Sequence, residues 1–243
     1  MDITSSLVIV AIAGLIHASF QLSVSMLTLL SSHTVGKKRS LGRLVLLTNS
    51  FALGAGLMTL LLLSTLSLVF SYIISASTSP DILLWTIACG LLAGVGISVW
   101  VFYYRKEAGT SLWIPRGVAR YLSERTKATK NSAEAFGLGL SSVVGELLFI
   151  IAPIVIAALI LINLEPFWQA MGIALYTFVS LGSLLIVNGL IGSGHSLARI
   201  QKWREENKTF LQFAAGSGLL VLAFYAYVGQ VVEVTAIAAA GSV

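Results

Sequence analysis

One carboxylate stands inside an apolar stretch of the chain. Glu146 is followed at once by the five apolar residues of 147–151. A charged side chain near the middle of a bilayer is costly unless it is paired, hydrated or protonated, and such residues mark ion or proton pathways by default. We therefore expect Glu146 to be a coupling residue. The alternative is a structural carboxyl that joins two helices by a hydrogen bond.

A second candidate, His17, lies on a polar stripe. On an ideal helix Gly14, His17, Gln21 and Ser25 share one face, because they follow one another at steps of three, four and four residues. Such a stripe faces protein or water, since lipid would penalise it. The imidazole could take a proton or bind a cation, and a buried histidine bonded to a neighbouring carbonyl is an equal alternative. If a metal binds at all, His17 and Glu146 would hold it.

Other polar side chains lie in the apolar stretches. Asn49 and Asn188 either bind substrate or, as we favour, form hydrogen bonds between helices. The predicted substrate- or ion-binding set is His17, Gln21, Ser25, Asn49, Ser142, Glu146 and Asn188. The sequence has no HExxH, GxSxG or Walker A motif. We therefore assign no catalytic residue, no enzymatic activity and no cofactor.

The composition defines the medium that must hold these residues. Of 243 residues, 57% are hydrophobic and 10% charged, and the mean hydropathy is +0.93. Soluble domains carry about 25% charged residues, so a soluble enzyme, a disordered chain, a coiled coil and a nucleic-acid binder are all disfavoured. The single cysteine, Cys89, excludes an internal disulfide and a cysteine zinc site.

Six apolar stretches without Lys or Arg are long enough to cross a bilayer, which takes about 20 residues. They are 6–31, 44–75, 82–104, 135–163, 167–193 and 209–232. The second and fourth are long for one crossing, so we expect tilt or a break in each. The candidate break points are Gly54 and Gly56 in the second, and Gly137, Gly139, Gly145 and Pro153 in the fourth.

All 15 Lys and Arg residues fall in the three alternate loops that follow the first, third and fifth stretches. Short loops rich in Lys and Arg remain cytoplasmic. The sequence therefore predicts a multi-pass protein of the cell (inner) membrane with both termini outside. The positive net charge is a topology signal, and nucleic acid is not an expected partner.

An odd number of spans in each half predicts inverted topology, which is a common transporter plan. We divide the chain into a three-helix repeat at 1–104, a cytoplasmic connector at 105–134 and a second three-helix repeat at 135–243. Within the connector, Pro115 and the apolar spacing of Val118, Tyr121 and Leu122 favour a short amphipathic helix on the membrane surface over a solvated linker.

Two segments resemble the LysE superfamily, which includes amino-acid exporters, metal exporters and thiol-electron carriers of the DsbD/CcdA type. The segment 135–147, Ala-Phe-Gly-Leu-Gly-Leu-Ser-Ser-Val-Val-Gly-Glu-Leu, is similar to the carrier segment with Thr-Pro-Cys, and 180–227 is similar in its glycine-rich spans and basic loop. Ser142-Val143 stands where the carriers have Pro-Cys, so the resemblance implies a carrier fold without the thiol relay. Gly14 to Ala18 also resembles the opening of a nickel/cobalt transporter motif, whose acidic continuation is missing here.

These features predict an all-α integral membrane protein of six transmembrane helices in two inverted three-helix repeats. The expected function is secondary transport or export of a small solute or cation through a polar site at the midplane between the repeats. The expected partners are the lipid bilayer and that solute, and a homo-oligomer remains open. The alternative is a non-transporting scaffold or partner-binding subunit whose polar residues pack helices.

Overall fold

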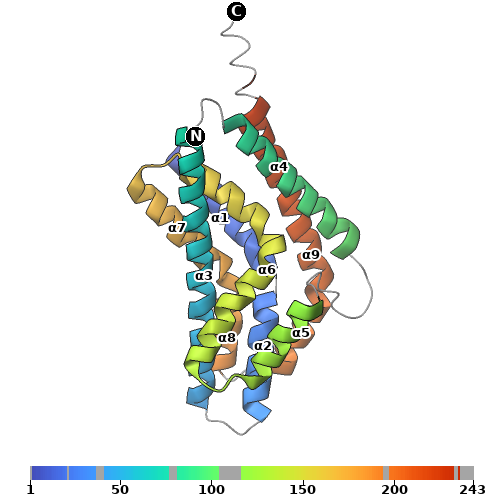
Figure 1. Ribbon diagram of the computed structural model, residues 1–243. Coiled ribbons are helices and arrows are strands. Elements are labelled where there is room, and N and C mark those ends of the chain that lie inside the picture. The colour runs from blue at the N-terminus through green and yellow to red at the C-terminus, as the bar shows by residue number, and fades with distance from the viewer. Residues whose placement is uncertain are drawn as a thin grey trace, which may run out of the picture.

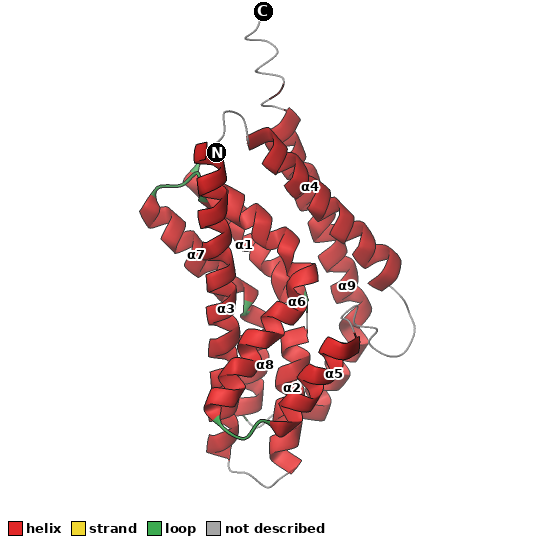
Figure 2. Ribbon diagram, viewed as in Figure 1, coloured by secondary structure: helices red, strands yellow, loops and turns green. Residues whose placement is uncertain are grey.

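The computed structural model describes residues 2–20, 22–36, 41–76, 81–103, 116–193, 197–232 and 235. These residues form helices and short connections, and no strand occurs among them (Figures 1 and 2). The helices are α1 (Ile3–Ser19), α2 (Leu22–Gly36), α3 (Leu41–Ala76), α4 (Asp81–Ser98), α5 (Arg116–Ala128), α6 (Ser132–Leu161), α7 (Pro166–Ser180), α8 (Gly182–Gly192) and α9 (Leu197–Tyr227), with π-helical turns η1 (Val99–Tyr103) and η2 (Val228–Val232). The all-α prediction is confirmed.

Four spans in the described part of the chain are long and apolar enough to cross a membrane. They are Gly42–Ala76, Ile82–Phe102, Ser132–Leu161 and Thr209–Val232. Two bent pairs of helices also qualify, and each pair counted as one span would bring the number to six. These pairs are α1 with α2, bent by 48°, and α7 with α8, bent by 51°. The helices are thus compatible with a multi-pass membrane protein.

The breaks fall in different spans from those expected. α3 is continuous through Gly54 and Gly56, and α6 is continuous through Pro153. The first and fifth spans are interrupted instead, at Phe20 and at Leu181. Gly54 and Gly56 of α3 and Gly139 of α6 lie instead where a neighbouring helix approaches closely.

α3 and α6 cross with their backbones almost in contact. A Cβ added to Gly139 of α6 would collide with the carbonyl oxygen of Phe51, and one added to Gly54 of α3 would collide with that of Phe136. Small residues allow this approach where lipid supplies no hydrophobic driving force between helices. The C-terminal third of α6 also belongs to the core of the molecule, since residues 152–161 are all buried.

The remaining helices pack around this crossing (Figure 1). α1 packs against α6 and α7, and α4 lies along α9. α5 packs against α2 and the first turns of α6, with Leu122 and Thr126 buried against them. The sequence predicted a short amphipathic helix in the connector, and α5 has exposed basic residues on the side opposite to this contact.

The start of α6 is fixed by a capping box. The Asn131 side chain accepts a hydrogen bond from the Glu134 N–H (2.8 Å), and the Glu134 carboxylate accepts one from the Lys130 N–H (2.6 Å). The two residues satisfy free backbone donors at the helix start reciprocally. The cap lies at the short connection between α5 and α6.

Candidate functional site

The two helix breaks meet at one small cavity. Its volume is about 20 Å³, which is room for about one water molecule or one bare ion. Side chains from both interrupted spans, from α3 and from α6 surround it. The polar members of this lining are His17, Ser23, Thr59, Glu146, Ser180 and Ser183.

Glu146 of α6 caps the first turn of α2. Its side chain is only 3% exposed, and its Oε1 accepts a hydrogen bond of 2.5 Å from the backbone N–H of Ser23. Ser23 is the second residue of α2, so this N–H is one of the donors that a helix start leaves unsatisfied. A carboxylate is also favoured there by the positive end of the helix dipole. The break in the first span is thereby compensated by another helix.

A second contact joins the same two helices. The hydroxyls of Ser23 and Ser142 lie 3.1 Å apart, and Ser142 donates its own hydrogen to the carbonyl of Gly139 at 2.8 Å. The Ser23 hydroxyl is therefore the donor to Ser142. Ser142 has no exposed surface and Ser23 is buried, so the pair is a buried contact next to the carboxylate.

His17 lies in the last turn of α1, just before the break. It is 5% exposed, and its Nδ1 is 3.1 Å from the hydroxyl of Tyr176 in α7, which has no exposed surface. The two rings are tilted with centroids 5.7 Å apart. A buried neutral imidazole can donate or accept here, depending on its tautomer. This contact joins the two interrupted spans.

A further hydrogen bond spans both breaks. Leu181 separates α7 from α8, and Ser183 in the first turn of α8 donates to the carbonyl of Ala18 at 2.9 Å. Ala18 is in the last turn of α1. The end of one half-helix is thus bonded to the start of the other, across the polar cavity.

The structure brings some predicted site residues together and separates others. His17 and Glu146 line the same cavity. Ser142 does not line it, but its hydroxyl contacts the hydroxyl of Ser23, which does. Asn49 and Asn188 are bonded to each other instead, with Asn188 Nδ2 donating to Asn49 Oδ1 at 2.7 Å, away from the cavity.

The single polar stripe expected for the first span is wrong, because α1 ends at Ser19. Phe20 adopts an extended backbone and Ser23 starts a new direction, so Gly14 and His17 belong to one helix and Ser25 to another. Gly14 and His17 are buried and Ser25 is half-buried. Gln21 lies outside the described residues.

Five residues of the site were not predicted from the sequence: Ser23, Thr59, Tyr176, Ser180 and Ser183. The signals for them were weak. Ser23 is one of several serines crowded into an apolar stretch, and Ser183 follows the only glycine near the middle of the fifth stretch, Gly182. Tyr176 looks like an ordinary aromatic core residue until its hydroxyl is seen against His17.

The arrangement offers groups that can exchange a proton or contact a small cation. Among the described residues, no group of three or more His, Cys, Asp and Glu side chains could hold a metal ion. The carboxylate, the imidazole and the serine hydroxyls offer oxygen and nitrogen ligands around a space of one ion. A carboxylate can release a proton when such an ion enters.

No family model matches the chain, and no curated protein or solved structure matches it either.

Proposed function

We propose that this protein is a secondary transporter or exporter of a small solute or cation. The observation that carries the proposal is the meeting of two interrupted apolar helices at a buried polar cavity that contains Glu146. Discontinuous helices of this kind form the substrate and ion sites of many secondary transporters, because half-helix ends present backbone donors and acceptors inside the membrane.

The contact between Glu146 and α2 supplies a switch. An ionised Glu146 is a strong acceptor for the Ser23 N–H and is favoured by the helix dipole. Protonation removes the charge, and with it most of the attraction between α6 and the start of α2. A cation that enters beside Glu146 competes for the same oxygens. Proton and cation would therefore bias α2 between two positions, which is the coupling that an exchanger needs.

The inverted repeat is part of the proposal, and the closest helix crossings support it. At one crossing, Gly139 of α6 meets the backbone of Phe51 in α3; at the other, Gly14 of α1 meets the carbonyl oxygen of Tyr176 in α7, 3.2 Å from an added Cβ. The two glycines are 125 residues apart in the sequence, and so are Phe51 and Tyr176. An alignment of the two halves with an offset of 125 residues therefore pairs both residues of one crossing with both residues of the other.

The helix neighbours also agree with exchange of the two halves. Let α1 and α2 together be the first of six spans, α3 the second, α4 the third, α6 the fourth, α7 and α8 together the fifth, and α9 the sixth. Exchange of the halves then turns the contact of the second span with the fourth into a contact of the fifth with the first, and both contacts are present. The first span packs on the sixth as the fourth packs on the third. The contact of the first span with the fourth and the contact of the third span with the sixth are each unchanged by this exchange, and both are present.

The remaining parts of the proposal rest on the sequence. The distribution of Lys and Arg supports six spans in the cell (inner) membrane with both termini outside. The segments 135–147 and 180–227 support a place in the LysE superfamily, without the thiol relay. We propose no catalytic activity and no nucleic-acid partner.

The proposal is tested with purified full-length protein in vesicles that contain a pH-sensitive dye. Na⁺, K⁺, Mg²⁺, Mn²⁺ and each amino acid are added outside in turn, with a pH gradient of either sign. We expect at least one solute to change the internal pH faster than in protein-free vesicles.

A non-transporting scaffold is the second candidate function. The observation that favours it is the size of the cavity, which at about 20 Å³ admits no organic solute in this conformation. Vesicles in which no solute of the series changes the internal pH would support the scaffold and contradict transport.

A further inference from the structure

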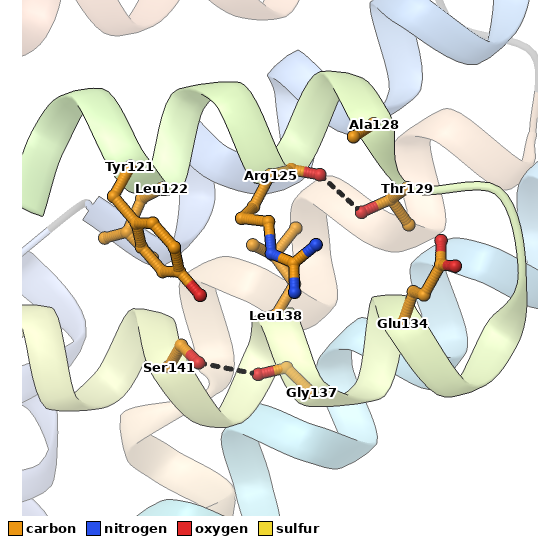
Figure 3. Close-up of a pocket in the computed structure, with 9 residues that line it drawn as sticks. All are labelled: Tyr121, Leu122, Arg125, Ala128, Thr129, Glu134, Gly137, Leu138 and Ser141. Atoms are coloured by element: carbon orange, nitrogen blue, oxygen red, sulfur yellow. Dashed lines mark hydrogen bonds between the residues drawn. The ribbon is translucent and has the colours of Figure 1, made fainter.

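A second cavity, far larger than the first, lies between α5 and the first turns of α6. Its volume is about 280 Å³, close to the lower end of the range of about 300–1,000 Å³ typical of small-molecule sites. Figure 3 shows its lining, which consists of Tyr121, Leu122, Arg125, Ala128 and Thr129 on the side of α5, and Glu134, Gly137, Leu138 and Ser141 on α6.

Two donors point from α5 into this space. The Arg125 guanidinium lies beside the Tyr121 ring, 5.9 Å from its centroid, and both side chains extend toward α6 (Figure 3). The Ser141 hydroxyl on the opposite wall is used within α6, where it donates to the Gly137 carbonyl at 2.9 Å. A guanidinium binds phosphate oxygens through charge-assisted hydrogen bonds, and a phenol hydroxyl can donate a further one.

The charges around the cavity favour an anion. Glu134 is the one carboxylate in its lining, and both of its oxygens are engaged in the cap of α6, by the Lys130 N–H and by the Asn131 amide at 3.0 Å. Arg125 is the cation in the lining, and α5 also carries the exposed cations Arg120 and Lys127 on its other side. Arg43 of α3 donates to the Lys130 carbonyl at 2.8 Å. Glu124 is paired with Arg120 at 3.5 Å.

The position of α5 is suited to the headgroup layer. The apolar span formed by α4 and η1 ends at Phe102, and α5 lies beyond the lower end of α4 (Figure 1). If α4 crosses the bilayer, α5 and the cavity lie where lipid phosphates lie. Tyrosine is enriched at this level of membrane proteins, and Tyr121 is 55% exposed.

An apolar track leads from the cavity toward the membrane. Val144 and Leu148 follow Ser141 on one face of α6 at steps of three and four residues, and they are 50% and 62% exposed. An exposed apolar face that begins at a phosphate cradle fits an acyl chain attached to that phosphate. This continuity favours a lipid over a free phosphate.

We propose that the cavity between α5 and α6 binds the phosphodiester headgroup of an anionic phospholipid, with Arg125 and Tyr121 on the phosphate and an acyl chain along Val144 and Leu148. The proposal does not depend on transport. Because α5 also packs on α2 through Leu122 and Thr126, whose hydroxyl lies 3.7 Å from the Met26 sulfur, the bound lipid would brace the half-helix that Glu146 caps.

The test is native mass spectrometry of the full chain, released from detergent and titrated with phosphatidylglycerol, with phosphatidylcholine and with glycerol phosphate. We expect tight binding of one phosphatidylglycerol, weaker binding of phosphatidylcholine and none of glycerol phosphate. Arg125→Gln should weaken phosphatidylglycerol binding about tenfold, the effect of losing one charged hydrogen bond. Arg125→Lys should weaken it less.

Lys127→Gln is the matched control, because it removes one exposed charge from the same helix without touching the cavity lining. Equal weakening by Arg125→Gln and Lys127→Gln would overturn the proposal, since it would show unspecific attraction to a basic helix. Binding of glycerol phosphate as tight as that of phosphatidylglycerol would also overturn it, because the acyl chain would then contribute nothing.

Discussion

The backbone N–H of Ser23 donates a 2.5 Å hydrogen bond to the Glu146 carboxylate, and the two residues are 123 positions apart in the sequence. Ser23 is the second residue of α2, and Glu146 lies midway along α6. Glu146 thus caps the first turn of α2 from another helix. We therefore expect a change in the charge of Glu146 to act on the position of α2.

The second tie across the breaks should stabilise the same region. Ser183→Ala removes the hydrogen bond to the Ala18 carbonyl, and we expect it to lower the free energy of unfolding in detergent by about 1 kcal/mol. Ser98→Ala is the control, because the exposed Ser98 hydroxyl bonds only within its own helix, to Gly94. Equal and negligible effects of both variants on thermal unfolding would show that the two half-helices are not held by this bond.

The crossing of α3 and α6 should tolerate no side chain at its centre. We expect Gly139→Ala to destabilise the protein by about 1–3 kcal/mol, as overpacking does elsewhere, because the added Cβ meets the Phe51 carbonyl. Gly137→Ala, two residues away on the same helix, meets nothing within 4 Å and should change stability little. Thermal unfolding of the two variants side by side gives the answer. A Gly139→Ala protein as stable as Gly137→Ala would contradict the crossing.

Asn49 and Asn188 should behave as one unit. Their amides are bonded at 2.7 Å between α3 and α8, and hydrogen bonds between membrane helices contribute about 0.6 kcal/mol on average, with a maximum of about 1.7 kcal/mol. A double-mutant cycle of Asn49→Ala and Asn188→Ala on unfolding free energy should give a coupling in that range. Strictly additive effects would contradict this coupling and would support the alternative that both amides bind substrate.

Much of the fold follows from local pattern. The apolar lengths of α3, α4, α6 and the later part of α9 are visible in the sequence, because a bilayer demands a continuous apolar run. The breaks are not visible, because the residue that compensates the first one, Glu146, belongs to a helix far along the chain. The glycines of the second and fourth stretches predicted helix breaks that do not occur, for the same reason. Gly54 and Gly139 are needed by a neighbouring backbone, and only the packed structure shows that neighbour.

The site was predictable in part for the same reason. A carboxylate and an imidazole in apolar surroundings stand out by type, so Glu146 and His17 could be selected from the sequence. The phenol of Tyr176 and the hydroxyl of Ser183 do not stand out, since aromatic and serine residues are common in membrane helices. Asn49 and Asn188 stood out by type as well, yet the structure bonds them to each other.

The orientation is open to a direct test. In a Cys89→Ala background, a cysteine at Asp2 should react with a membrane-impermeant thiol reagent added to intact cells, because the N-terminus is expected outside. A cysteine at Lys37 should react only after the cells are opened, because its loop is expected inside. The readout is mass labelling of the purified protein. Labelling at position 37 in intact cells would refute the topology.

The most direct test of the central claim is the pH dependence of flux in Glu146→Gln vesicles. Glutamine preserves the shape of the side chain and an oxygen acceptor for the Ser23 N–H, and it removes the titratable charge. Glu165→Gln is the control, because Glu165 is exposed at the start of α7 and far from the cavity lining. With the solute that moves protons in the wild type, we predict that Glu165→Gln keeps the wild-type rate and pH profile, and that Glu146→Gln remains folded but falls to the rate of protein-free vesicles. Full flux through Glu146→Gln with an unchanged pH profile would contradict the account and leave Glu146 as a structural cap of α2.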